Sequence, residues 1–124
     1  IPAGQAELGV GIHGERGVDR RAFSRRREVI EHCVDEVFSK LSPGDDPLIV
    51  LVNDLGQADP SDVESALLSV NERAENLGMS IVRTKVGRFV TSADMDGLSI
   101  TLMRANPDIL SLYDAPTLAP SWSE

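Results

Sequence analysis

The clearest pattern in the chain is a helical one. From about Ser24 to Leu41, apolar residues recur three and four positions apart, as on the buried face of an amphipathic helix. Pro43-Gly44 stops this pattern. The first turn would hold Arg25 to Arg27, although cations are unfavourable at this end of the helix dipole, and such a broken rule often has a functional cause. The apolar positions are Val29, Ile30, Cys33, Val34, Val37, Phe38 and Leu41.

A second helix is predicted from Asp59 onward. Asp59 suits the N-cap and Pro60 the first helical position, and Gly78 provides the expected stop. Ser61 with Glu64 offers a competing capping box two residues later. The apolar stripe of this helix comprises Val63, Ala66, Leu67, Val70, Ala74 and Leu77.

Four short segments carry strand patterns, and together they predict a mixed sheet: Ala6–Ile12, Leu48–Val52, Ile81–Val86 and Leu98–Met103. Leu48–Val52 is a continuous aliphatic run, typical of a strand buried on both faces. We therefore expect this strand to be central in the sheet. Because a two-layer domain covers only one face of its sheet, we expect the other face to be partly apolar. It would meet a missing lobe, a second subunit of a homodimer, or both.

The remaining segments complete a single domain. Asn106-Pro107 caps a short helix through about Tyr113, and residues 53–56 and 91–97 are predicted loops. The tail from Asp114 to Glu124 has little pattern. A length of 124 residues, with no internal repeat or linker, predicts one domain over residues 1–124. The expected fold class is α/β (α+β), a two-layer sandwich of a mixed β-sheet with helices mainly on one face.

Composition and charge narrow the class of protein. No apolar run approaches the roughly 18–20 residues that cross a bilayer, and no signal pattern follows Ile1, so we expect a soluble protein without a membrane partner. The single cysteine, Cys33, excludes an internal disulfide and fits the cytoplasm. Its place on an apolar stripe favours a small buried side chain over a nucleophile. The net charge of −8 opposes direct binding of nucleic acid.

The positive charge is nevertheless concentrated in one place. Residues 16–27, which we call the arginine-rich segment, contain six of the 12 basic residues and one acidic residue, Asp19. The ordinary interpretation is a solvated basic face. The alternative is a docking surface for an acidic or phosphate-bearing partner, whose association would then depend on ionic strength. The sequence leaves both open.

The two histidines differ in their surroundings. His32 lies inside the first predicted helix, offset from the apolar stripe, so a structural role at the solvent edge is expected. His13 ends the first predicted strand among glycines 9, 11, 14 and 17, which would let a small molecule approach closely. His13 is therefore the residue expected to do chemistry.

Several kinds of site are disfavoured by the motifs that are missing. A zinc site needs three or four ligands, and His13 has only Glu15 and Asp19 as nearby candidates. A Ser-His-Asp arrangement remains open, but the chain has no Gly-x-Ser-x-Gly elbow. The Gly-rich Walker loop that binds ATP phosphates is also missing, so no cofactor is expected on this chain. The remaining kind of chemistry is that of a neutral imidazole, which can act as a nucleophile or as an acid–base group.

Three longer runs make the sequence recognisable. They are AELGVGIHGERG (Ala6 to Gly17), VLVNDLG (Val50 to Gly56) and TSADMDGLSITLM (Thr91 to Met103), and a short DAP run follows from Asp114 to Pro116. Together these runs resemble the dihydroxyacetone kinase family. The resemblance is to the second lobe of the dihydroxyacetone-binding K subunit or K domain. It covers nearly the whole chain with the runs in the same order.

The resemblance implies a covalent substrate site. In the family, the histidine of GIHGE, here His13, adds to the ketone carbon of dihydroxyacetone and holds it as a hemiaminal while a terminal hydroxyl is phosphorylated. A separate L-type subunit or domain carries ATP or ADP with magnesium, and in the ADP-using branch a phosphotransfer-system protein recharges it.

Two differences from the family pattern limit which residue roles can be assigned to this chain. Arg16 stands where the family usually has proline after GIHGE. The other substrate-contacting groups of the family, including the carboxylate that acts on the hydroxyl, lie in a first lobe that this chain lacks, so the isolated lobe is expected to be inactive alone. Only His13 is therefore assigned, as both catalytic and substrate-binding residue, and loops 53–56 and 91–97 receive no chemical role. A non-catalytic sensor that controls transcription, and a kinase for a related ketose such as erythrulose, remain alternatives.

Overall fold

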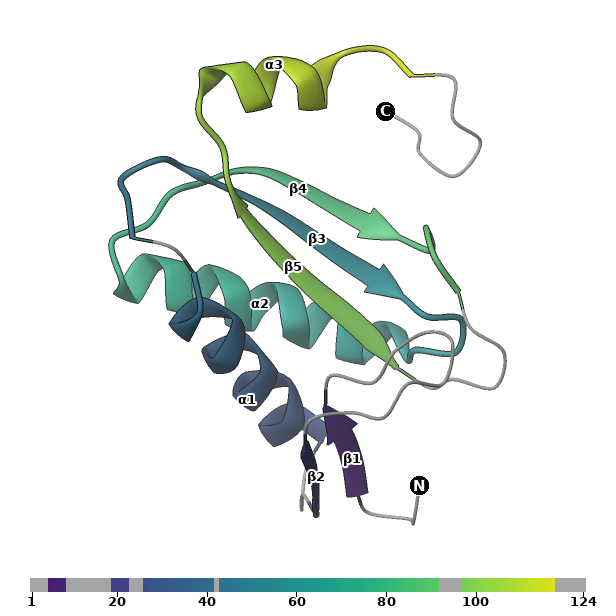
Figure 1. The fold of residues 1–124 in the computed structure, drawn as a ribbon. Helices are drawn as coiled ribbons and strands as arrows, with labels where there is room; N and C mark the ends of the chain where they lie inside the picture. The colour runs from purple at the N-terminus through teal and green to yellow at the C-terminus, as the bar shows by residue number, and fades with distance from the viewer. Residues whose placement is uncertain (1–4, 9–18, 23–25, 42, 92–96, 118–124) are drawn as a thin grey trace.

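The computed structural model describes residues 5–8, 19–22, 26–41, 43–91 and 97–117. This part of the chain forms eight helices and strands, which are labelled in Figure 1. In chain order they are β1 (Gln5–Leu8), β2 (Asp19–Ala22), α1 (Arg26–Ser39), β3 (Leu48–Asp54), α2 (Pro60–Asn76), β4 (Ile81–Gly87), β5 (Leu98–Arg104) and α3 (Pro107–Asp114).

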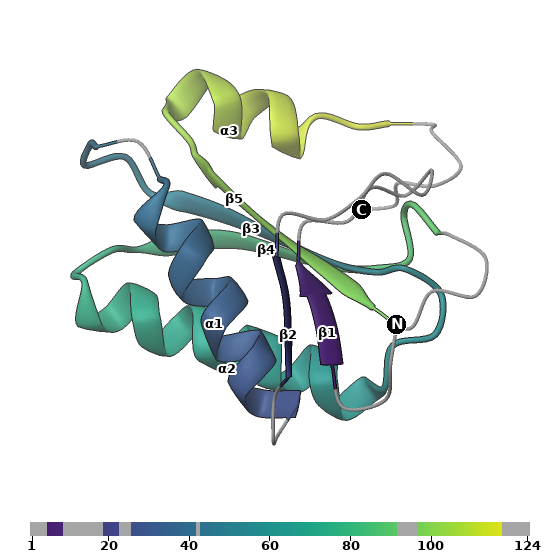
Figure 2. The ribbon, with the colours of Figure 1, turned by 60° about the horizontal axis from the view of Figure 1, so that its bottom comes forward.

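A three-stranded mixed sheet forms the centre of the domain. The strand order is β4-β3-β5, with β3 parallel to β4 and antiparallel to β5. Helix α2 makes the crossover between the two parallel strands, as a β-α-β unit requires. Figures 1 and 2 show α1 and α2 together on one side of the sheet and α3 on the other. The predicted two-layer mixed fold and the central position of Leu48–Val52 are confirmed.

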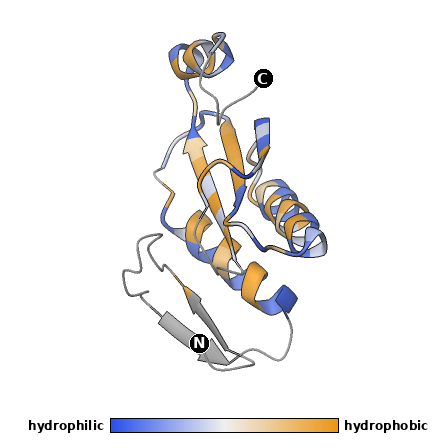
Figure 3. Ribbon diagram, turned by 90° about the vertical axis from the view of Figure 1, so that its right-hand side faces the viewer, coloured by the Kyte–Doolittle hydropathy of each residue, from blue (hydrophilic) through white to orange (hydrophobic). Residues whose placement is uncertain are grey.

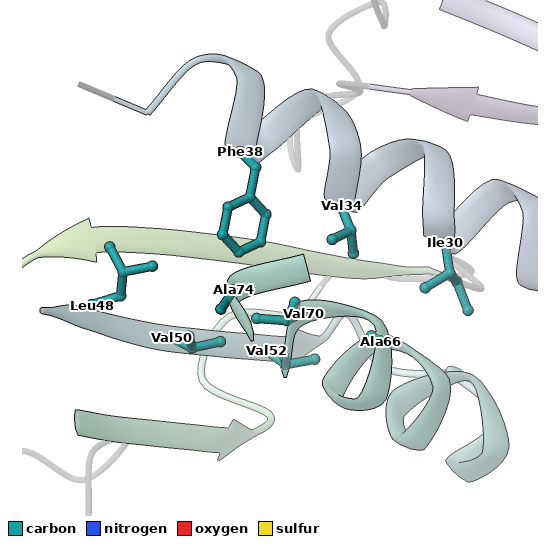
Figure 4. Packing of buried hydrophobic residues seen from close by; sticks show 9 residues of the cluster. All are labelled: Ile30, Val34, Phe38, Leu48, Val50, Val52, Ala66, Val70 and Ala74. Carbon is teal, nitrogen blue, oxygen red and sulfur yellow. The ribbon is translucent and has the colours of Figure 1, made fainter. Parts of the chain in front are cut away.

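The core lies between β3 and the two long helices. Figure 4 shows the apolar side chains of α1 directed toward the sheet, with α2 closing the same space. Two of the α2 residues are alanines, which lets this helix approach the sheet closely. The buried cluster consists of Ile30, Val34 and Phe38 from α1, Leu48, Val50 and Val52 from β3, and Ala66, Val70 and Ala74 from α2. Both predicted helical stripes face the core, but Val29, Cys33 and Val37 are only half-buried, and Leu77, which follows the end of α2, is 46% exposed.

The opposite face of the sheet is partly apolar, as predicted. Ile49 is buried and Leu51 is half-buried, while Met103 on the neighbouring strand is 43% exposed. Figure 3, coloured by hydropathy, shows mostly apolar strands between helices whose surfaces alternate between polar and apolar. Contact of this face with another lobe or a second copy of the chain stays a prediction.

The helix caps follow the sequence closely. Asp59 is the N-cap of α2, and its Oδ1 accepts hydrogen bonds from the backbone N–H (2.9 Å) and the hydroxyl (2.8 Å) of Ser61. The competing capping box is therefore wrong, because Ser61 serves as a donor to the true cap. Gly78 follows α2 with φ of +69°, which favours glycine. Asn106 caps α3 by accepting a hydrogen bond from the N–H of Ile109.

The described part of the first predicted strand, up to Leu8, does not join the main sheet, so the prediction was wrong for these residues; residues 9–12 lie outside the described part. Strand β1 instead pairs with β2 in a separate antiparallel hairpin. Strand β2 was missed because Asp19–Ala22 has no apolar alternation and lies within the arginine-rich segment. Its strand conformation depends on pairing with β1, which no local pattern reveals.

Candidate functional site

His13, the predicted site residue, lies outside the described residues. Its position in the chain is still informative, because residues 9–18 connect the two strands of the hairpin. Leu8, the last residue of β1, is the register partner of Asp19, the first residue of β2. The segment that contains His13 therefore leaves the hairpin and returns to it at paired positions.

The arginine-rich segment is partly engaged by acidic residues of the helices. Nη1 of Arg26, in the first turn of α1, lies 2.6 Å from Oδ2 of Asp62 on α2. Nε of Arg27 lies 2.9 Å from Oε1 of Glu31 one turn later. These pairs offset the unfavourable position of the two arginines at the start of α1. Arg16 and Arg25 lie outside the described residues, and the docking role of the whole segment stays a prediction.

The remaining sequence candidates occupy ordinary positions on α1. His32 is half-buried at the edge of the apolar stripe. Cys33 is half-buried as well, and burial, with the nearby charge of Glu36, raises the pKa of its thiol. A raised pKa disfavours the thiolate, so the thiol suits packing better than nucleophilic chemistry.

A network of hydrogen bonds at the carboxyl end of β3 was not predicted. Asn53 is 5% exposed, and its Oδ1 accepts hydrogen bonds from the N–H groups of Phe89 (2.8 Å) and Val90 (3.1 Å). Its Nδ2 donates to the carbonyl of Val90 at 2.7 Å. One amide side chain thus binds both polar groups of Val90, as a neighbouring strand would.

Asp54 extends the network on the other side of the strand end. Its Oδ1 accepts hydrogen bonds from the N–H groups of Gly56 (2.7 Å) and Ala58 (3.0 Å), and its Oδ2 accepts one from Nε of Arg88 (2.7 Å). The backbone donors at Ala58 and Gly56, followed by Arg88, lower the pKa of this carboxyl to about 2. The carboxylate therefore stays charged at any physiological pH.

The network joins two runs that the sequence analysis treated separately. The N–H of Leu55 donates to the carbonyl of Gly97 at 3.0 Å, immediately before β5. Asn53 and Leu55 therefore hold the chain at Val90 and at Gly97, on either side of residues 91–96, of which 92–96 lie outside the described part. The predicted 53–56 loop was partly wrong, because Asn53 and Asp54 are the last residues of β3. The sequence signal that could have pointed to this network was the abrupt change from five aliphatic residues, Leu48 to Val52, to the polar pair Asn53-Asp54.

An open groove of about 560 Å³ lies elsewhere, between the end of α1 and the end of β5. It contains none of the predicted site residues; its lining residues are Val37, Lys40, Leu41, Leu102, Met103 and Arg104. Within the described ranges, no three His, Cys, Asp or Glu side chains gather as a metal site requires. No helix in that part of the chain is both long and apolar enough to cross a bilayer.

Comparison with characterised proteins gives consistent matches. The curated relatives include the dihydroxyacetone-binding subunit DhaK of the PEP-dependent dihydroxyacetone kinase of Escherichia coli, 32% identical over 146 aligned residues. They also include the L-erythrulose 1-kinase of Mycolicibacterium smegmatis, 32% identical over 127 residues. The alignments cover 94% and 98% of this chain, but only 40% and 22% of those proteins. The chain thus spans well under half of the length of these relatives.

Solved structures agree with the sequence matches. The dihydroxyacetone kinase operon co-activator Dha-DhaQ superposes with a TM-score of 0.82 at 28% identity, over 94% of this chain and 37% of that one. The dihydroxyacetone kinase of C. freundii, in complex with AMP-PNP and Mg²⁺, gives 0.67 at 25% identity, over 87% and 20%. The family model of the Dak1 domain matches residues 1–121. The chain therefore belongs to the Dak1 domain family.

Proposed function

We propose that this chain is the second lobe of the dihydroxyacetone-binding unit of a dihydroxyacetone kinase, and that His13 binds the substrate covalently. The observation that carries the proposal is the match of the Dak1 model to residues 1–121. Identity of 32% to a subunit named for binding dihydroxyacetone supports it. The GIHGE run that resembles the family places the only histidine outside α1 at position 13.

The proposal includes a division of the substrate site between two lobes. The 124 residues form one domain in the proposal, and the chain spans 40% of the E. coli subunit. A first lobe would supply the other substrate contacts, including the carboxylate that acts on the hydroxyl. This chain alone would therefore bind dihydroxyacetone poorly and transfer no phosphoryl group.

Capture of the substrate would be a reversible addition. The lone pair of an unprotonated imidazole nitrogen forms a bond to the ketone carbon as the carbonyl π bond breaks. The resulting alkoxide takes up a proton, and the imidazolium loses its other N–H proton, so the net change is addition of N–H across the carbonyl. Dihydroxyacetone offers little surface for recognition, whereas this bond requires a carbonyl group. Glycerol would therefore be rejected, and the reacting hydroxyl would be held in one orientation.

Phosphoryl transfer would need a partner. An L-type subunit or domain would hold ATP or ADP with magnesium, and the C. freundii kinase structure with AMP-PNP and Mg²⁺ supports a nucleotide donor in this family. The terminal hydroxyl of the bound ketone would attack the γ-phosphorus of the ATP, whose bond to the oxygen of the departing ADP would break, and the hydroxyl proton would pass to the carboxylate of the first lobe. Reversal of the addition would then release the phosphorylated product and restore His13.

Mass spectrometry of the natural polypeptide that carries this sequence tests the proposal. With dihydroxyacetone, the intact folded polypeptide should gain the mass of one substrate molecule, and a crystal structure of the complex should show the bond at His13. His13→Ala should abolish the adduct and weaken discrimination against glycerol. His13→Asn is polar and of similar size but not nucleophilic, so it separates covalent capture from hydrogen bonding. His32→Ala is the matched control and should keep the adduct.

A second candidate function is a non-catalytic sensor of dihydroxyacetone that co-regulates transcription. The TM-score of 0.82 to the operon co-activator favours it specifically. Such a sensor would form the His13 adduct but support no phosphoryl transfer when a donor subunit is added. A kinase for a related ketose is the third candidate, supported by the identity of 32% to the L-erythrulose 1-kinase. Competition between dihydroxyacetone and erythrulose for turnover would distinguish the two kinases.

A further inference from the structure

The carboxyl ends of β3 and β4 form one edge of the sheet. These strands are parallel and adjacent, so the residues that follow them emerge on the same side. In open α/β sheets, ligands bind outside the carboxyl ends of parallel strands. We call residues 53–56 and 88–91, together with Gly97, the carboxyl edge. Two runs that resemble the dihydroxyacetone kinase family, from Val50 and from Thr91, meet here.

Asn53 holds this edge together from inside. It is buried, and its three hydrogen bonds all go to the backbone of Phe89 and Val90. A valine or leucine would pack as well at the end of an aliphatic strand, so burial alone does not explain an amide there. An amide is explained by the need to satisfy two N–H donors and one carbonyl acceptor at one point.

The other contacts of the carboxyl edge come from Asp54 and Leu55, the two residues that follow Asn53. Arg88, one residue before Phe89, is held by Asp54, the neighbour of Asn53. Gly97, where the chain returns to the sheet, is held by the N–H of Leu55. The backbone is thus fixed where it leaves β4 and where it enters β5, from three successive residues of β3 and its loop.

We propose that Asn53 is a positioning residue for phosphoryl transfer, which acts by fixing the backbone at Phe89–Val90 in the carboxyl edge. The proposal rests on the proposed kinase function. Asn53 would act on transfer and not on capture, because its hydrogen bonds fix the backbone of Phe89 and Val90 and its proposed role requires no contact with His13. Loss of Asn53 should therefore leave the His13 adduct intact while the transfer step slows.

The test compares variants of matched stability in the natural polypeptide, assayed with its phosphoryl-donor partner. Asn53→Ala removes all three hydrogen bonds, and Asn53→Asp keeps the acceptor for both N–H groups but loses the donor to Val90. Val52→Ala is the matched control, since Val52 is fully buried beside Asn53 but faces the helices. Each protein is assayed well below its own unfolding temperature, for adduct formation and for the rate of transfer.

We expect Asn53→Ala to slow transfer at least tenfold and Asn53→Asp to slow it severalfold, with adduct formation within twofold of wild type. Val52→Ala should transfer at the wild-type rate. If Asn53→Ala does not fold, Asn53→Asp decides the question. Transfer at the wild-type rate in that folded variant, or an equal loss in Val52→Ala, would overturn the positioning role alone. Failure of the wild-type protein to transfer phosphoryl would overturn the kinase proposal and the positioning role with it.

Discussion

The helix-facing side of β3 and its carboxyl end lie a few residues apart but are stabilised in different ways. Val50 and Val52 are buried against α1 and α2 by apolar contact alone. Asn53 and Asp54 form six hydrogen bonds, five with specific backbone atoms and one with the side chain of Arg88. Apolar packing depends on volume and tolerates several side chains, whereas the polar end accepts only groups with the correct donors and acceptors. The first region therefore determines that the chain folds, and the second determines where its loops lie.

The largest expected effect comes from the apolar side. Phe38 is 6% exposed and fills the space between α1 and the sheet. Phe38→Ala should lower the free energy of unfolding by about 3–5 kcal/mol, because it removes buried area and leaves a cavity. Urea denaturation measures this value. A loss below about 1 kcal/mol would show that the packing of α1 contributes little to stability.

The second-largest effect on stability is expected at the carboxyl end of β3. Asn53→Ala should lower the free energy of unfolding by about 1–3 kcal/mol, because it removes three hydrogen bonds to part-buried backbone groups of Phe89 and Val90. Amide hydrogen exchange should accelerate at Val90 more than at Val50 in the centre of the strand. Equal acceleration at both positions would mean that the polar end is not a separate local unit.

A helix cap gives a smaller effect and was predictable from sequence. Asp59→Ala should cost about 1 kcal/mol in unfolding free energy, because the N–H of Ser61 loses its acceptor. Asp59→Asn is the control, since an amide oxygen can accept the same hydrogen bond. A cost as large for Asn as for Ala would contradict the capping role.

The last prediction concerns the pH dependence of stability and the carboxyl group of Asp54. Its pKa is lowered to about 2 in the folded protein, compared with about 3.9 for an unperturbed aspartate. A lowered pKa means that Asp54 stabilises the fold above about pH 4 and loses this contribution as the pH falls toward 2. The difference in unfolding free energy between wild type and Asp54→Asn should shrink over this range. A difference that stays constant from pH 7 to pH 2 would contradict the lowered pKa.

The same contrast explains what could be predicted from sequence. Helices α1 and α2, strand β3 and the caps at Asp59 and Asn106 depend on periodicity and local hydrogen bonds, and the sequence shows both. Strand β2 and the bonds of Asn53 to Val90 depend on residues brought together only by the fold. The hydrogen-bonded partners of Asn53 lie 36 and 37 positions away, so no local signal identified them.

The residues of the candidate site also differ in how far the sequence alone could predict their surroundings. His13 was identified from its glycine-rich surroundings and from a resemblance, and it lies outside the described residues. Arg26 was expected within a basic surface, yet it forms an ion pair with Asp62, 36 positions away. Charge clusters in a sequence show where charges are concentrated but not which ones are paired.

The most direct test of the central claim is the mass of the intact folded polypeptide after incubation with dihydroxyacetone at several pH values, for the wild type and the two histidine variants. The account predicts an adduct of one substrate molecule on His13 near pH 7. The adduct should weaken toward about pH 5, because an ordinary imidazole titrates near 6.5 and only its unprotonated nitrogen can attack a carbonyl. The adduct should be lost in His13→Ala and kept in His32→Ala. Substrate bound without a covalent bond to His13, or full selectivity over glycerol in His13→Ala, would contradict the account.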